Sequence, residues 1–266
     1  MSERVIITIE NQVATVTLNR AEKRNAVDMD MFAALIDTAE SLARNNSVRA
    51  VVLHGDGGHF CAGIDISVFE GGGSVAELTA RMEPRAGSVA NFYQSVATLW
   101  QELPVPVIAA LEGTTFGAGF QIAMGADVRY AGQDLQISIM EIKWGIIPDM
   151  GITVTVPGVV PQDKARLLAY TGRVLTAVEA QEFGLVTELA DNPVVAAHAL
   201  ATEISQKSPD AIRAIKRLTN EAWGQDSAAL LRREAELQMA VMAGENMAEA
   251  VQAVSEARAP RFKDPG

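Results

Sequence analysis

The chain has 266 residues and a hydrophobic fraction of 48%, which is enough to bury a large core in one domain or in one domain with an appendage. Its formal net charge of −11 argues against general nucleic-acid binding, because such binding takes most of its affinity from a basic surface. No apolar run is long enough to span a bilayer, no hydrophobic signal region opens the chain, and a single cysteine excludes an internal disulfide, so we expect a cytoplasmic protein.

The first part of the chain predicts strands and one helix. Val5–Glu10 and Val13–Leu18 alternate in character around a two-residue turn, which indicates a hairpin. Asp28 can cap a helix over Met29–Ala43, whose apolar residues fall on one face. Val48–Leu53 is short and apolar, as expected of a buried strand.

Two Gly-rich turns follow buried strands. The first runs over His54–Ile66, and the second follows Val105–Leu111 and leads into a helix at Phe120–Met124. The first N–H groups of a helix have no partner within it, so such a turn can hold a phosphate or a developing oxyanion. The alternative is a tight turn that only allows close packing. Gly113, Gly117 and Gly119 do not have the dinucleotide-binding spacing.

The remaining elements predict an α/β core followed by helices. Ser88–Leu103 predicts a helix with Val89, Phe92, Val96, Leu99 and Trp100 facing inward, and Asp127–Ala131 and Leu135–Ile139 predict short strands. From Gln162 onward the pattern is almost wholly helical, over Gln162–Tyr170, Ala177–Phe183, Val194–Gln206, Pro209–Trp223, Ala228–Ala243 and Asn246–Ala257. A boundary near Pro193 would divide a core of residues 1–193 from a helical region of residues 194–266.

The evidence for a metal site in the sequence is weak. His54 and His59 share a loop without a fixed helical spacing, so no metal site is predicted. Cys61 is expected to be a small core residue and not a nucleophile. Val68–Glu83, which includes three consecutive glycines, is expected to cover a site or to be a surface excursion. An apolar stripe on the helix Ala228–Ala243 predicts a core or subunit contact.

A series of short motifs spans the chain in a fixed order. They are Asn19-Arg20-x-Glu22-Lys23-Arg24-Asn25-Ala26, Phe60-x-Ala62-Gly63-x-Asp65, Pro106–Ala110, Gly113-x-x-x-Gly117-x-Gly119, Ala126-Asp127, Glu141-x-x-x-Gly145-Ile146-x-Pro148, Thr171-Gly172 and Gly184-Leu185-Val186. Together they resemble the crotonase superfamily, also called the enoyl-CoA hydratase/isomerase family, over nearly the whole chain.

The resemblance implies an α/β fold, a spiral of strand-strand-helix repeats with a C-terminal helical trimerisation region. It implies an acyl-CoA thioester substrate whose enolate is stabilised at the carbonyl oxygen. Coenzyme A is then part of the substrate, and no further cofactor and no metal is expected. A homotrimer or a dimer of trimers is the implied assembly.

The resemblance also implies residue roles. The backbone N–H groups of Ile64 and Ala118 would form the oxyanion hole. The positions implied in CoA binding are Lys23, Arg24, Ala26, Ala62, Asp65 and Ile66. Arg258, Arg261 and Lys263 are candidates for contacts at the adenine end, or are solubilising charges of the tail.

Three positions bear on the reaction. Family hydratases use two glutamates, of which one aligns with Glu141 and the other with Gln121. Glutamine neither takes nor gives a proton, so the pair of carboxylates is incomplete here. Simple isomerases resemble this chain, and Asp149 aligns with an acid that dienoyl-CoA isomerases use in proton transfer. The resemblance therefore predicts a double-bond isomerase with Glu141 as base and Asp149 as a possible second acid–base group.

Other interpretations remain open. Asp149 could instead cap a helix after Pro148. The position of Asp149 also carries the nucleophile of a chlorobenzoyl-CoA dehalogenase, but Glu141 stands where that enzyme has tryptophan. The enzyme could be a hydratase of low or unusual activity, or catalyse another enolate reaction such as hydrolysis, and a non-catalytic acyl-CoA-binding protein is an interpretation from a different class. The sequence does not reveal the acyl chain.

Overall fold

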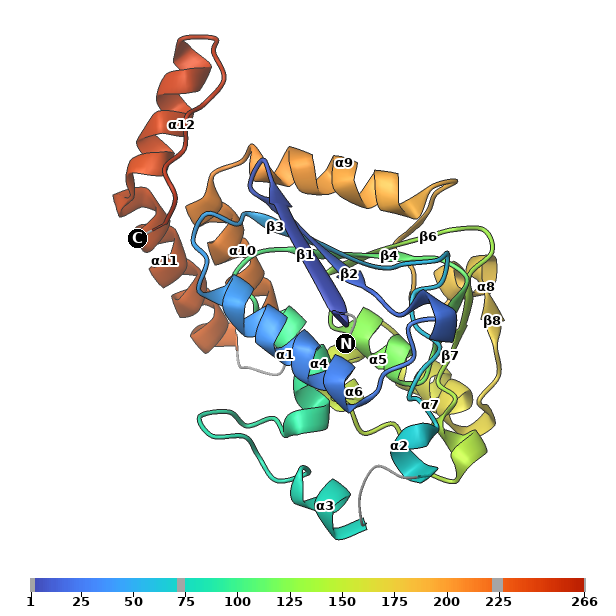
Figure 1. Cartoon of the computed structure of the whole chain (residues 1–266). Coiled ribbons are helices and arrows are strands. Elements are labelled where there is room, and N and C mark those ends of the chain that lie inside the picture. The colour runs from blue at the N-terminus through green and yellow to red at the C-terminus, as the bar shows by residue number, and fades with distance from the viewer. Residues whose placement is uncertain (1–2, 71–74, 222–226, 266) are drawn as a thin grey trace.

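A six-stranded sheet forms the centre of the molecule in the computed structural model, which describes residues 3–70, 75–221 and 227–265 (Figure 1). β1 and β2 pair antiparallel as a hairpin, and every other neighbouring pair is parallel. In sheet order the strands are β1 (Val5–Glu10), β2 (Val13–Leu18), β3 (Ala50–Gly55), β4 (Val107–Leu111), β6 (Val128–Ala131) and β9 (Glu188–Leu189). A second sheet contains β5 (Thr114–Phe116), β7 (Gln136–Ser138) and β8 (Leu175–Thr176).

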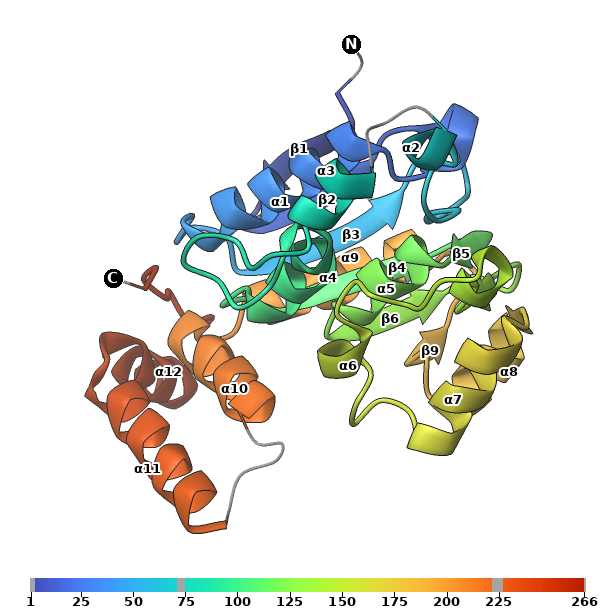
Figure 2. The same cartoon turned by 90° about the horizontal axis from the view of Figure 1, so that it is seen from below.

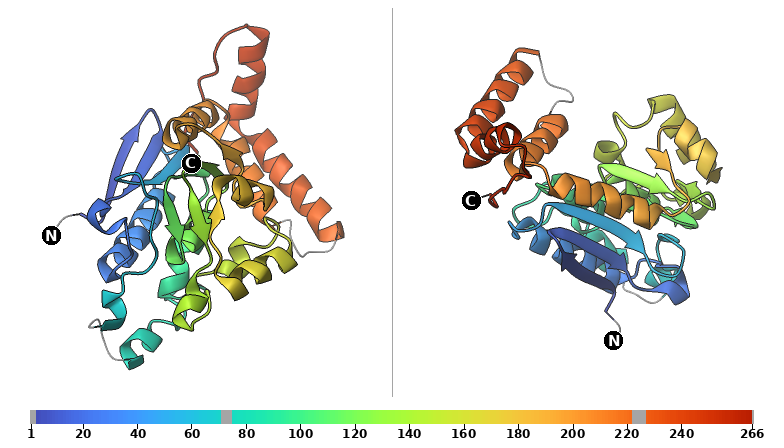
Figure 3. Two further views of the ribbon diagram at one scale, coloured as in Figure 1. Left: turned by 90° about the vertical axis from the view of Figure 1, so that its right-hand side faces the viewer. Right: turned by 90° about the horizontal axis from the view of Figure 1, so that it is seen from above.

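Helices cover both faces of the six-stranded sheet (Figures 1 and 3). β3 is buried on both sides because Val51 and Leu53 point into the larger cluster, while Ala50 and Val52 join a smaller one. The larger cluster packs under α1 (Met29–Ala43), α4 (Phe92–Glu102) and α5 (Ala118–Met124). The smaller one is covered by α9 (Pro193–Ser205), whose Ala197 and Ala201 are completely buried. Continuous apolar strands such as β3 are typical of sheets covered in this way.

The remaining helices lie around this core. The 3-10 helices are η1 (Ala21–Lys23) and η2 (Glu141–Trp144). The α-helices are α2 (Ser67–Glu70), α3 (Val75–Ala80), α6 (Ile152–Thr155), α7 (Gln162–Thr171), α8 (Ala177–Glu182), α10 (Pro209–Glu221), α11 (Ser227–Ala243) and α12 (Glu245–Ser255). Figure 2 shows α10, α11 and α12 gathered at one end of the molecule, with α7 and α8 at the opposite end. The predicted mixed α/β fold with a helical C-terminal region is confirmed.

Local patterns located several elements correctly. The predicted hairpin has the bounds expected, and the helix over Met29–Ala43 is confirmed. Its cap is also confirmed, since the Asp28 carboxylate accepts a hydrogen bond from the Met31 N–H at 2.8 Å. The predicted glycine run and the end of the helix Pro209–Trp223 fall on residues 71–74 and 222–223, which lie outside the described part of the chain.

The predicted start of one helix was wrong. The helix expected from Ser88 begins at Phe92, because Asn91 and Gln94 form a reciprocal capping box that fixes its first turn. Val89 therefore lies before the helix and is 94% exposed instead of facing inward. The region after Gln162 is mostly helical as predicted, over α7 to α12, and its two short strands, β8 and β9, add to the edges of the two sheets.

The division predicted near Pro193 stays a prediction. Helix α9 begins at Pro193, yet it packs on the six-stranded sheet and not on the helices that follow. The C-terminal tail is tied back to this region by Arg49, whose guanidinium donates to the Ser205 and Phe262 carbonyl oxygens at 3.1 and 3.0 Å.

Candidate active site

A cavity of about 520 Å³ lies between the two Gly-rich turns and η2. It is lined by Lys23, Ala26, Ala62, Gly63, Ile64, Asp65, Ile66, Ser67, Phe116, Gly117, Ala118, Met140, Glu141, Trp144, Ile146, Asp149 and Met150. The wall is mainly apolar, and two of its three carboxylic acids, Glu141 and Asp149, belong to the same loop region after β7. Such a pocket, with few polar groups converging in it, is typical of a small-molecule site.

The two turns are held together by backbone contacts. The Cys61 N–H donates to the Thr114 carbonyl oxygen, and the Phe116 N–H donates to the Cys61 carbonyl oxygen, both at 3.0 Å. Gly119 is required at this crossing, because a Cβ on it would lie 2.4 Å from the Cys61 oxygen. The approach brings the segment after Cys61 to the N-terminus of α5.

This arrangement leaves two backbone donors at the cavity. Ala118 is the first residue of α5, so its N–H has no partner within the helix. Ile64 is held on either side, because the Val27 N–H donates to the Gly63 oxygen and the Asp65 N–H donates to the Val27 oxygen. Within the described residues neither the Ile64 nor the Ala118 N–H makes a hydrogen bond, and both residues line the cavity.

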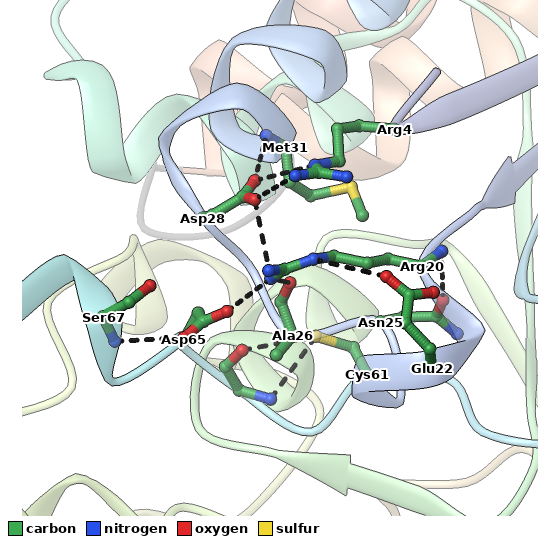
Figure 4. A network of polar contacts seen from close by, with 11 residues as sticks. Arg4, Arg20, Glu22, Asn25, Ala26, Asp28, Met31, Cys61, Asp65 and Ser67 are labelled. Atoms are coloured by element: carbon green, nitrogen blue, oxygen red, sulfur yellow. Dashed lines mark hydrogen bonds and ion pairs between the residues drawn. The ribbon is translucent and has the colours of Figure 1, made fainter. Parts of the chain in front are cut away.

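Arg20 connects the loops that form one wall of the cavity (Figure 4). Its guanidinium contacts the carboxylates of Asp65 at 2.6 Å and Asp28 at 3.5 Å, and donates to the Ala26 oxygen at 2.9 Å. Asp65 also accepts from the Ser67 N–H at 3.0 Å. These bonds hold the pKa of Asp65 at about 2, first through the Ser67 N–H and then through Arg20. Asp65 is therefore ionised at neutral pH and fixed in place.

Glu141 lies in the opposite wall of the cavity, and Gln121 lies behind it. Glu141 begins η2 and is 7% exposed, and Gln121 on α5 is 1% exposed. The Gln121 amide nitrogen donates to Glu141 Oε1 at 2.6 Å, and its amide oxygen accepts from the Met150 N–H at 2.8 Å. Glu141 Oε2 is buried and makes no hydrogen bond to any described residue.

Burial perturbs both acids of the cavity. Desolvation raises the pKa of Glu141, and the nearby charge of Asp149 raises it further, while the backbone N–H of Glu141 and the Gln121 N–H lower it. Desolvation also raises the pKa of the half-buried Asp149. Two carboxylic acids with raised pKa values in one cavity are suited to general acid–base chemistry near neutral pH.

Comparison with known proteins identifies the family. The enoyl-CoA hydratase/isomerase family model matches residues 8–265. The chain belongs to this family. The 1,2-epoxyphenylacetyl-CoA isomerase of Escherichia coli is 30% identical over 98% of this chain and 99% of its own. The human mitochondrial Delta(3,5)-Delta(2,4)-dienoyl-CoA isomerase is 31% identical over 94% of this chain and 78% of its own.

Solved structures agree with the fold. The crystal structure of an enoyl-CoA hydratase from Mycobacterium tuberculosis matches with a TM-score of 0.86 and 28% identity, over 99% of this chain and 100% of that one. The predicted crotonase fold is thereby confirmed. Relatives are named both hydratase and isomerase, so membership establishes an enzyme of this family that acts on an acyl-CoA.

The cavity of this family member brings together most of the predicted site residues. Lys23, Ala26, Ala62, Ile64, Asp65, Ile66, Ala118, Glu141 and Asp149 all line it. Gln121 and Arg24 do not, and Gln121 lies behind the wall. The carboxylate of Asp65 is occupied by Arg20 and Ser67, which indicates a role in holding the loop.

The alternative role for Asp149 as a helix cap is wrong. The next helix, α6, has Gly151 as its N-cap and no side-chain cap hydrogen bond. Asp149 instead lines the cavity with Glu141. Its raised pKa also differs from that of a carboxylate stabilised at a helix N-terminus.

Sequence reasoning missed part of the site. Phe116, Met140, Trp144 and Met150 belong to the apolar wall, and their pattern gave no signal because only the fold brings them together. Ile146 was found only as part of a motif. Arg20 was found only as part of a motif and not as the partner of Asp65. Cys61, in contrast, is completely buried as predicted, and burial raises the pKa of its thiol to about 12.

The cations expected near the adenine end are mostly paired. Arg258 contacts Glu249 at 2.6 Å and Glu256 at 2.5 Å, and Lys263 pairs with Glu245. They lie on the tail and are not among the residues that line the cavity. Over the described ranges, the histidines, cysteine and acids form no group of three that could hold a metal, and no helix is long and apolar enough to cross a membrane.

Proposed function

We propose that this enzyme is a double-bond isomerase of acyl-CoA thioesters. The observation that carries the proposal is the neutral amide of Gln121, bonded to Glu141 Oε1 at 2.6 Å in the place of a second carboxylate. Glutamine cannot exchange a proton, so water activation by two acids at these positions is not available. The human relative named Delta(3,5)-Delta(2,4)-dienoyl-CoA isomerase supports the same reaction class.

The reaction moves one proton and one double bond. The thioester oxygen accepts hydrogen bonds from the Ile64 and Ala118 N–H groups, each worth about 3 kcal/mol to the developing oxyanion. Glu141 removes a proton from C2 of a 3-enoyl-CoA, and the electron pair of that C–H bond delocalises into a dienolate. Protonation at C4 then gives the 2-enoyl-CoA. Glu141 or Asp149 returns the proton, since both line the cavity.

The CoA moiety would lie along two loops of the cavity wall. Lys23 and Ala26 lie on one loop, and Ala62 and Ile66 on the other. Lys23 supplies a positive charge for a phosphate. A local positive charge is enough to bind an anionic group, even on a protein that is acidic overall. Proton transfer of this kind needs no metal and no cofactor beyond the CoA of the substrate. A cytoplasmic location remains a prediction.

A hydratase of unusual design is the second candidate. Asp149 shares the cavity with Glu141, and the pKa of each is raised. Asp149 could thus replace the missing glutamate in activating a water. Enoyl-CoA hydratases among the structural relatives keep this candidate open.

A panel of thioesters tests the proposal. Straight-chain 2-enoyl-, 3-enoyl- and 3,5-dienoyl-CoA are incubated with the enzyme. The products are separated by chromatography, and their masses are measured by mass spectrometry. Isomerisation leaves the mass unchanged, whereas hydration adds one water. We expect isomerisation to be faster. Fast hydration without isomerisation would exclude the proposal, and thioester binding without any turnover would favour a binding protein.

We also propose that the chain assembles as a homotrimer or a dimer of trimers. Helices α11 and α12 expose large apolar side chains on the outside of the molecule, including Leu231, Met239, Met242, Val251 and Val254. An exposed apolar surface of this kind is typical of a protein–protein contact.

A further inference from the structure

The side chain of Gln121 connects two parts of the active-site wall. Its amide nitrogen donates to Glu141 Oε1 at 2.6 Å, and its amide oxygen accepts from the Met150 N–H at 2.8 Å. Both of its partners line the cavity, but Gln121 is 1% exposed and does not. Met150 follows Asp149 directly, so the planar amide group of Gln121 joins the Glu141 carboxylate to the backbone next to Asp149.

This geometry makes the two oxygens of Glu141 unequal. Oε1 is occupied by the Gln121 N–H, whereas Oε2 is buried and has no hydrogen-bond partner among the described side chains and backbone. Buried carboxylate oxygens without a partner are costly, and they are found where a group serves catalysis. Oε2 is thus the oxygen of Glu141 that has no protein donor and is free to accept a proton.

We infer that Gln121 is a positioning residue that makes Glu141 Oε2 the proton-transferring oxygen and fixes the spacing between Glu141 and the Asp149 segment. The inference deepens the proposed function and rests on it for the role of Glu141 as base. Gln121 touches no substrate, because it lies behind the wall. It acts through the orientation of Glu141.

The same contact disfavours water addition. A bridging water needs about 2.8 Å to each of its two partners. The amide nitrogen of Gln121 and Glu141 Oε1 are only 2.6 Å apart, so no water fits between them. In a hydratase, a second acid at this position would hold the attacking water. Gln121 places a neutral donor there instead, and so it favours proton transfer over hydration.

The charged groups around Glu141 come from several segments. Asp149 follows η2, Lys23 and Asp65 belong to the loops across the cavity, and Lys143 is exposed on η2 itself. Asp149 and burial raise the pKa of Glu141, and the Gln121 N–H lowers it by favouring the ionised form. Loss of that N–H alone must then raise the pKa of Glu141.

The variant Gln121→Met removes both hydrogen bonds at nearly constant volume. A base must be ionised, so the acid limb of the pH–rate profile follows the pKa of Glu141 and should move to higher pH. We expect turnover to fall about ten-fold or more, with little change in KM. The matched control is Gln181→Met, the same change at an exposed position of α8, which should leave both the profile and turnover unchanged.

A second variant separates positioning from packing. Gln121→Glu keeps an acceptor for the Met150 N–H but can donate to Glu141 only when protonated. We expect its isomerase activity to survive at low pH and to fall as pH rises and the shared proton is lost. A purely structural role would lower the thermal midpoint of both variants without moving either profile.

Direct titration of Glu141 makes the test independent of turnover. Carbon-13 NMR of carboxyl-labelled protein, assigned with Glu141→Gln, follows the Glu141 signal in wild type and in Gln121→Met. An upward shift of its midpoint in the variant supports the inference, and an unchanged midpoint in a folded variant overturns it. The proposed function fails separately, if wild type hydrates faster than it isomerises.

Discussion

Burial acts in the same direction on Glu141 and Asp149, two of the three carboxyl groups that line the cavity. Desolvation raises the pKa of Glu141 and of Asp149, and the charge of Asp149 adds to the effect on Glu141. The backbone N–H of Glu141 and the Gln121 N–H oppose these effects and favour the ionised form that acts as a base. The chemistry of the site thus depends on three side chains whose effects are separable by substitution.

The substitution Glu141→Gln removes the proton acceptor from a nearly isosteric side chain. Turnover should fall about 100-fold or more, since a positioned base contributes 10²- to 10⁴-fold. Binding of CoA, measured by calorimetry, should change little because Lys23 and the two loops remain. Retention of more than about a hundredth of the wild-type rate would show that another group is the principal base.

The substitution Asp149→Asn removes a charge that faces Glu141. The pKa of Glu141 should fall, because the charge of Asp149 raises it, and the acid limb of the rate profile should move to lower pH. This is opposite in sign to the shift expected for Gln121→Met. Turnover should drop about ten-fold or more if Asp149 exchanges protons with substrate.

Stability measurements provide the control for Asp149. Asp149 caps no helix, so thermal unfolding of Asp149→Asn should resemble that of wild type. Unchanged kinetics together with an unmoved pH profile would remove Asp149 from the reaction.

The loops of the cavity are positioned by interactions between elements that are distant in sequence. Arg20, just before η1, joins Asp28 at the start of α1 to Asp65 before α2 (Figure 4). Ile64 lies between Gly63 and Asp65, which both bond to the backbone of Val27. The orientation of the Ile64 N–H therefore depends on this ion-pair network.

The substitution Asp65→Asn should weaken this network. A largely buried charge-assisted contact is lost, so the free energy of unfolding should drop by about 1–3 kcal/mol, as measured by urea denaturation. Turnover should fall as well, through displacement of the Ile64 N–H. The matched control is Glu22→Gln, because Glu22 is 71% exposed and 3.9 Å from the same guanidinium, and it should change stability little.

The dependence on pH gives a second check on Asp65. Its pKa is lowered from the usual 3.8 to about 2, chiefly by the Ser67 N–H and then by Arg20. A lowered pKa means that its contribution to stability is complete above pH 3.8 and is lost as pH falls through about 2. Wild type and Asp65→Asn should converge in stability over that interval, and a constant difference down to pH 2 would contradict this account.

At the scale of the whole molecule, the C-terminal helices are the least covered part. α11 has no buried residue, and Leu231 and Met242, three turns apart, are 66% and 55% exposed. The inner side of the same helix faces α10 and the tail. Exposure of both residues is explained if a second copy covers α11.

Assembly can be measured by light scattering. Wild type should have a mass of three or six chains, and Leu231→Glu combined with Met242→Glu should give a smaller species, because burying two charges at an apolar contact is costly. Glu234→Gln, an exposed position on the same helix, is the control. A monomeric wild type would contradict the proposed assembly.

Short sequence patterns were sufficient to predict the elements that are specified by neighbouring residues. The alternation of Val5–Glu10 and Val13–Leu18 was sufficient for the hairpin, and Asp28 with a periodic helix was sufficient for α1. Periodicity failed at the start of α4, because the capping box of Asn91 and Gln94 decides where a helix begins, whereas apolar spacing does not. The motif resemblance placed Glu141, Asp149, Ile64 and Ala118 around one site before the fold was known.

Only the tertiary structure decided how the site residues act on one another. Gln121 accepts from an N–H 29 residues away and donates to an acid 20 residues away, and η1, α1 and β3 lie between Arg20 and Asp65 in the chain. No local pattern records such contacts, since they form only when the sheet brings distant turns to one edge. Burial has the same origin: a carboxyl group has its usual pKa in the unfolded chain, and the fold that removes water from Glu141 and Asp149 raises it.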